Sequence, residues 1–137
     1  MDNYFNTANR MYKSSQNLHA NQDFHNSCYL AGYVIECYIK ITINLLSGSN
    51  PPHSHDISNL NSKCLKYIAT GNSSNQNYFI DSSTNFSAIL QKWNPVNTRY
   101  TEKINELIEK DSTTFQSEIN IAMQKIAQMR LDGHNLI

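Results

Sequence analysis

An acid and a base lie one helical turn apart in the most apolar stretch of this chain, LAGYVIECYIKITINLL from Leu30 to Leu46. Glu36 and Lys40 have i, i+4 spacing with the acid first, which is the favourable order for an ion pair on a helix. On an exposed face the pair would contribute only about 0.3–0.5 kcal/mol. On a mostly buried helix both charged ends need a groove, an interface or a further partner. The pair is therefore either a solvated strip on that helix or part of a dimer interface or ligand groove.

The segment HSHDISNL contains a second group of candidate functional residues, His53, His55 and Asp56. These residue types can ligate a metal, but neighbours in one loop rarely supply three ligands without help from elsewhere. We therefore expect no metal and no cofactor. We expect His55 to bond a backbone group or a facing helix, and Asp56 to cap the helix that follows.

The segment WNPVNTRY brings Trp93, Arg99 and Tyr100 together in a polar region. An arginine beside aromatic rings can stack on a base or clamp a phosphate. It can equally anchor the fold by pairing with a buried carboxylate such as Glu36. Near the end of the chain, Arg130 and a histidine four residues later could form a catalytic pair, but Gly133 predicts that the histidine lies beyond the helix end.

Composition narrows the function classes further. The chain has 137 residues and a net charge of +0, so it lacks the basic excess typical of proteins that bind nucleic acid through phosphates. Its three cysteines form no CxxC pair, and the first residues do not resemble a signal peptide, so we expect a cytoplasmic protein with reduced thiols. The segment 28–46 is long enough to span a membrane, but its polar residues favour a buried core helix instead. We find no Walker motif, GxSxG or HExxH.

The elements that must position these residues are helical. Apolar residues recur at four-three spacing over about 3–20 and again at Phe115, Ile119, Ala122, Ile126 and Met129. A nearly all-apolar helix is expected over about 23–47, ended by Gly48. A third helix follows Asp56, with a buried face at Ile57, Leu60, Cys64, Tyr67 and Ile68.

Shorter elements complete the expected architecture. A short helix should begin near Thr84 and run through Phe86 to Trp93, broken by the Asn94-Pro95 pair. A polar link and a modest apolar stripe at Ile104, Leu107 and Ile108 should follow, and a capping box of Thr113 and Gln116 should start the last helix. The prediction is one all-α domain over residues 1–137, an up-and-down bundle of four main helices plus short extra helices.

Three segments, taken in order, resemble the HEPN family, the nucleotide-binding domain of higher eukaryotes and prokaryotes. YLAGYVIECYIKI is similar to the family's second helix, in which an apolar run carries Glu and, four residues later, Lys. HDISNL is similar to a His-Asp-Leu-x-x-Leu segment, and WNPVNTRY resembles a later Trp…Arg-Tyr segment. The resemblance covers roughly Tyr4 to Met129.

This resemblance implies a helical bundle that is commonly dimeric and often encoded beside a small nucleotidyltransferase, in toxin–antitoxin or defence systems. Active members are metal-independent ribonucleases with an Arg, four to six intervening residues and a His. Here Arg99 is followed by YTEKIN, the gap from Arg10 to His19 is too long, and the gap from Arg130 to His134 is one residue too short. Catalytic residues are therefore left unassigned. The residues that match the family's polar set are Glu36, Lys40, His55, Asp56, Trp93, Arg99 and Tyr100.

Three functions follow as hypotheses. The first is a non-catalytic HEPN-like protein that dimerises and binds a nucleotide, an RNA or a nucleotidyltransferase partner, without a membrane. The second is a divergent metal-independent ribonuclease, in which Arg99 or Arg130 stabilises the phosphate and His55 or His134 is the acid–base catalyst. The third is a purely structural helical module, in which the polar set only ties helices together.

Overall fold

The computed structural model describes residues 3–71, 74–99 and 106–137, with the side chain of Arg99 left outside that description. In these ranges the chain is helical and contains no strand, which confirms the all-α prediction. The four long helices are α1 (Tyr4–Ala20), α2 (Phe24–Ser47), α3 (Ile57–Thr70) and α7 (Glu109–Leu131). Between α3 and α7 lie the short elements η1 (Gln76–Tyr78), α4 (Ser82–Asn85), α5 (Ser87–Lys92) and α6 (Pro95–Arg99).

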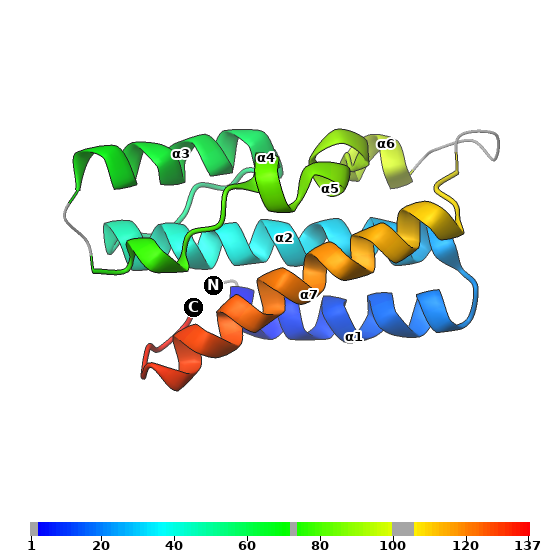
Figure 1. Cartoon of the computed structure of the whole chain (residues 1–137), viewed down its shortest axis with the longest axis horizontal. Helices are drawn as coiled ribbons and strands as arrows, with labels where there is room; N and C mark the ends of the chain where they lie inside the picture. The colour runs from blue at the N-terminus through cyan, green and yellow to red at the C-terminus, as the bar shows by residue number, and fades with distance from the viewer. Residues whose placement is uncertain (1–2, 72–73, 100–105) are drawn as a thin grey trace.

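Helix α2 is the centre of the bundle, because α1, α3, α6 and α7 all pack against it (Figure 1). From residue 34 to residue 43 every one of its residues is buried. By length and composition it is apolar enough to cross a membrane, but a core helix surrounded by protein passes the same test. The prediction of a central core helix agrees with this arrangement.

The segment between α2 and α3 carries the chain back along α2. His55, just before α3, contacts Glu36 in the middle of α2, and Asn75, just beyond α3, donates a hydrogen bond to the Leu45 carbonyl near the end of α2. Helix α3 therefore runs in the same direction as α2. This return places the start of α3 opposite the middle of α2, where the polar residues of the core helix lie.

The helix ends follow local rules that are visible in the sequence. The Asp56 carboxylate accepts from the Asn59 N–H at 3.1 Å, so Asp56 caps α3 as predicted. Gly48 ends α2 in the left-handed region at φ 72°, where a side chain would be strained. Gly133 closes α7 in the same way at φ 92°.

Other boundaries differ from the prediction. The expected single helix around residues 84–93 is split into α4 and α5. Asn94-Pro95 starts α6 instead of opening a polar link, because the Asn94 side chain accepts from the N–H groups of Val96 and Asn97, both at 3.0 Å. Of the expected apolar stripe, Ile104 lies outside the described residues, and residues 107 and 108 precede α7.

The start of α7 and one face of α3 also correct the prediction. Helix α7 begins at Glu109, where Asp111 accepts from the Ile108 N–H at 3.0 Å, so the proposed capping box at Thr113 was wrong. Gln116 instead donates to the hydroxyls of Ser15 and Ser27, tying α7 to α1 and α2. On α3, Tyr67 is exposed rather than buried.

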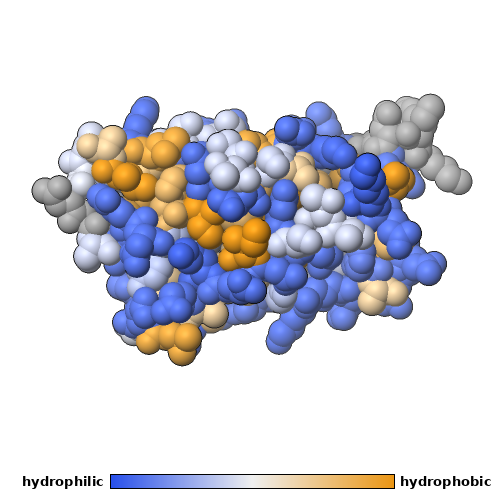
Figure 2. Space-filling view, viewed as in Figure 1, coloured by the Kyte–Doolittle hydropathy of each residue, from blue (hydrophilic) through white to orange (hydrophobic). Residues whose placement is uncertain are grey.

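The face of the molecule in Figure 2 is mostly hydrophilic, and its hydrophobic side chains gather over α3, beside α4 and at the end of α7.

Helix α5 is held in place by a carboxylate from α7. The two oxygens of Glu118 accept from the N–H groups of Ala88 and Ile89 at 3.0 and 2.9 Å, so one side chain satisfies two unpaired donors at the start of a short helix. Glu118 is only 7% exposed, and its desolvation raises the pKa of the carboxyl above its ordinary value despite these bonds. The position of α5 therefore depends on a tertiary contact.

Replacing Glu118 by Ala should lower the free energy of unfolding by about 1–3 kcal/mol, because two N–H groups at the start of α5 lose their acceptors. Urea denaturation of the variant and the wild type measures this difference. Gln124→Ala, at an exposed position on the same helix, is the matched control and should change stability by less than about 0.5 kcal/mol. Equal effects of the two substitutions would contradict the role given to Glu118.

Candidate functional site

Glu36 is the centre of the polar set. Its carboxylate is nearly buried on α2 and accepts from two sides: Lys40 Nζ lies 3.2 Å from Oε2, and His55 Nδ1 lies 2.9 Å from Oε1. Residue exposures of 4% for Glu36 and 3% for Lys40 exclude the interpretation of a solvated strip. The structure therefore brings together three of the seven predicted residues in one hydrogen-bonded unit.

Lys40 belongs to the interior part of this unit. Its ammonium group lies 5.2 Å from the centre of the Tyr4 ring on α1, within the range of a cation–π contact. A buried ammonium is strongly destabilising without a partner. The Glu36 carboxylate and the Tyr4 ring face together stabilise the charge of Lys40. This group faces protein rather than the groove described below, and it serves as a support.

His55 belongs to the exterior part of the same unit. Its side chain is 67% exposed although one ring nitrogen is bound to a buried carboxylate. Because a carboxylate only accepts, Nδ1 carries a proton and donates to Glu36, which leaves Nε2 outside this bond. The Tyr33 ring packs edge-on against the imidazole with ring centres 6.3 Å apart. His55 therefore has a fixed ring orientation at the protein surface.

Trp93, at the end of α5, is positioned by close contact with Gly32 on α2. An ideal Cβ built on Gly32 would lie 1.9 Å from an atom of the Trp93 ring, so the ring occupies the space that a side chain would need. The indole N–H donates to the Tyr29 carbonyl at 2.9 Å, and the Tyr33 ring meets the indole edge-on. Glycine at position 32 is therefore the condition for the Trp93 position.

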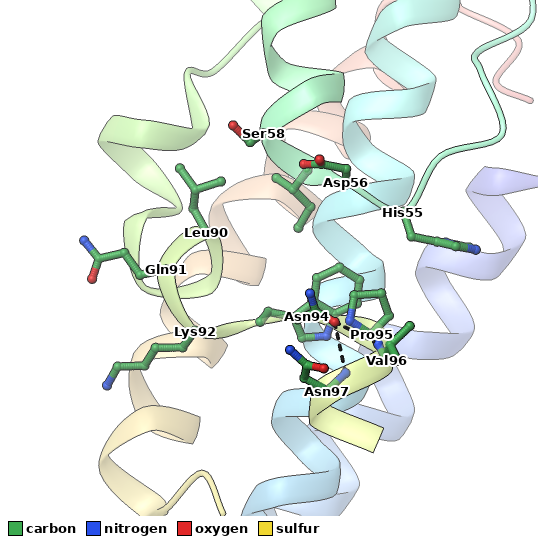
Figure 3. A pocket seen from close by; sticks show the side chains of 12 residues that line it. His55, Asp56, Ser58, Leu90, Gln91, Lys92, Asn94, Pro95, Val96 and Asn97 are labelled. Carbon is green, nitrogen blue, oxygen red and sulfur yellow. Dashed lines mark hydrogen bonds between the residues drawn. The ribbon is translucent and has the colours of Figure 1, made fainter. Parts of the chain in front are cut away.

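A groove of about 640 Å³ lies between the start of α3 and the segment formed by α5 and α6 (Figure 3). Its size is that of pockets for small organic ligands. Polar and aromatic side chains dominate its lining, including His55, Asp56, Ser58, Gln91, Trp93, Asn94 and Asn97. In Figure 3, Ser58 on α3 and Asp56 just before α3 face the α5–α6 segment across the groove, and His55 lies at its rim. Three predicted site residues, His55, Asp56 and Trp93, thus line this groove, and His55 connects it to the buried Glu36–Lys40 pair.

The remaining predictions have separate outcomes. Tyr100 and the side chain of Arg99 lie outside the described residues, so their partners are left open. Arg130 and His134 do not form a pair: the guanidinium lies over the Phe5 ring and the imidazole packs against Tyr78.

Metal and thiol chemistry have little support among the residues that the structure describes. No group of three His, Cys, Asp or Glu side chains there is placed to hold a metal ion. Burial raises the pKa of the Cys28 and Cys64 thiols to about 12, so neither supplies a thiolate at neutral pH.

His25 is a positioning residue that the sequence reasoning missed. One ring nitrogen, Nδ1, accepts from the Leu107 N–H at 3.0 Å, which assigns the proton to Nε2, the donor to the Thr98 carbonyl at 2.7 Å. This one side chain on α2 thereby fixes both sides of the segment that carries Arg99 and Tyr100. No motif marks it in the sequence, because the two partners are backbone groups far along the chain.

The fold and this groove define the class: an all-α bundle whose central helix carries a buried, paired carboxylate next to a polar groove. A family model described as the HEPN domain matches residues 1–122, and the chain belongs to the HEPN family. No curated protein and no solved structure matches the chain in the same comparisons. Membership of this family supports a role connected with nucleotides or RNA.

Replacing Glu36 by Ala should destabilise the protein by about 3–5 kcal/mol, because Lys40 is then buried without its acid. Thermal and urea denaturation measure the loss. The double variant Glu36→Ala/Lys40→Met should recover part of it, since the unpaired charge is removed as well. A double variant as unstable as the single one would contradict a buried ion pair.

Replacing Gly32 by Ala should destabilise the protein by about 1–3 kcal/mol through overpacking against the indole. The same substitution made in a Trp93→Ala background should cost much less, because the ring that blocks the methyl group is gone. A double-mutant cycle of unfolding free energies tests this. Independent, additive effects of the two substitutions would show that the close contact does not govern the packing.

Proposed function

We propose that this protein is a non-catalytic HEPN protein that binds a nucleotide or a short single-stranded RNA in the groove between α3 and α6. The observation that carries the proposal is the groove itself, which has the volume of a small-ligand site and offers side-chain amides, a hydroxyl and an aromatic edge. Amide side chains can donate to and accept from base edges, and this recognition needs no excess of positive charge.

Charge distribution around the groove supports recognition of the base more than of the phosphates. The Asp56 carboxylate already occupies the N-terminus of α3, which would otherwise attract an anion. Lys92 is paired with Asp111 at 2.5 Å. His55 lies at the rim; its doubly protonated form can donate to a phosphate through Nε2, whereas in the neutral ring that nitrogen is an acceptor. Arg99 follows two residues after the groove residue Asn97 in α6.

We further propose that the protein acts as a homodimer and that a nucleotidyltransferase is its protein partner, in a toxin–antitoxin or defence system. Both proposals are supported by membership of the HEPN family. The resemblance to this family implies that the protein is commonly dimeric and encoded beside a nucleotidyltransferase.

A second candidate, a divergent metal-independent ribonuclease, is favoured by one specific observation. The Glu36–His55 hydrogen bond orients an exposed imidazole and leaves Nε2 outside, which is an arrangement suited to a general acid–base. The non-catalytic proposal is preferred because the chain lacks the family's Arg–His spacing.

Binding should be weakened at least five-fold by Asn97→Ala and by His55→Ala, because each removes a polar group from the groove or its rim. Isothermal titration with the four nucleoside monophosphates and with short RNA oligomers measures the affinity. His53→Ala, at an exposed position two residues from His55 and outside the groove lining, is the matched control and should leave it unchanged.

The outcomes separate the candidates. No binding of any nucleotide or RNA by the wild type would contradict the proposal. Cleavage of RNA in the presence of a chelator, lost in His55→Ala and retained in His53→Ala, would contradict the non-catalytic proposal and support the ribonuclease candidate.

A further inference from the structure

A second groove lies between the first turns of α1 and the last turns of α7. It measures about 530 Å³ and is lined by Phe5, Asn9, Met123, Ile126, Arg130 and Leu131, with Ala127 on its wall. Most of these side chains are apolar, and Leu131 is 81% exposed. A groove of this size with an apolar floor is suited to a small organic ligand.

Among the described residues that line this groove, Arg130 is the only charged one. Its guanidinium carbon lies over the Phe5 ring, 4.5 Å from the ring centre, so the charged group is held at the groove wall by a cation–π contact. Within the described part of the chain, no carboxylate lies within 4.0 Å of this guanidinium. The next residue but one, Asp132, is bound instead to Tyr78 and Gln128.

The groove is also short. Its α7 side extends from Met123 to Leu131, about 12 Å of helix at 1.5 Å per residue. At the start of α1 the Phe5 N–H donates to the Ile137 carbonyl at 2.7 Å, which brings the C-terminal segment beside the groove. A long partner helix does not fit such a length as well as a compact molecule does.

We propose that this groove binds a small amphipathic anion, with an acyl or aryl body on the apolar floor and one carboxylate paired with Arg130. A planar guanidinium forms two parallel hydrogen bonds with a carboxylate, and the apolar body gains by leaving water. The α7 C-terminus carries a partial negative charge that opposes an anion, so the apolar body supplies a substantial part of the affinity. This site is independent of the groove at His55 and of the function proposed for it.

Octanoate is the probe, with 1-octanol as its uncharged counterpart. NMR titration of the 137-residue chain should show octanoate shifting resonances of α1 and α7 residues around the groove. Arg130→Gln should weaken octanoate about ten-fold and leave 1-octanol unchanged. Arg10→Gln, a charge removed from an exposed position on α1 outside the groove, is the matched control and should bind octanoate like the wild type.

A second variant tests the cavity itself. Ala127 is exposed, so Ala127→Trp should fold while filling the groove, and it should weaken both probes at least ten-fold; a thermal melt checks the fold. Equal octanoate affinity in Arg130→Gln and the wild type, shifts that map away from α1 and α7, or no binding at millimolar octanoate would each overturn the proposal.

Discussion

A carboxylate buried in the central helix cannot remain without partners, and much of the structure around α2 meets this requirement. Glu36 is 4% exposed, and its two oxygens are satisfied by Lys40 from the same helix and by His55 from the segment before α3. The second contact requires the chain to return along α2 after Gly48, and this return sets the direction of α3. The Glu36 carboxylate, through its bond to His55, thus links the interior of the bundle to the place where α3 begins.

The groove beside this unit is formed by short elements that could not stand alone. Helices of five or six residues are marginal in water and depend on tertiary contacts. Here α5 is held by the Glu118 carboxylate, α6 by the Asn94 side chain and His25, and the link between them by the Trp93 ring on Gly32. Recognition side chains on these elements are therefore positioned by two long helices, α2 and α7, which are a rigid support for residues of a ligand site.

The long helices and several caps were predictable because they depend on local rules. Apolar spacing identified α1 and α7, a nearly continuous apolar run identified α2, and Asp56 and Gly48 marked the boundaries correctly. The division of residues 82–99 into three short helices was not predictable, since Pro95 is compatible with a helix start as well as with a break. Gln116 was misassigned to a cap because its partners, Ser15 and Ser27, lie about a hundred residues away in sequence.

The same distinction applies to the candidate site. The sequence by itself determined that Glu36 and Lys40 share one face of a largely apolar helix, because i, i+4 spacing is a property of helix geometry. It also identified His55, Asp56 and Trp93 as members of one family-like set. Only the tertiary structure decided that Glu36 bonds both Lys40 and His55, that Lys40 is inside and His55 outside, and that Trp93 lies on Gly32. These facts depend on contacts between elements far apart in the chain, and no local pattern encodes such distances.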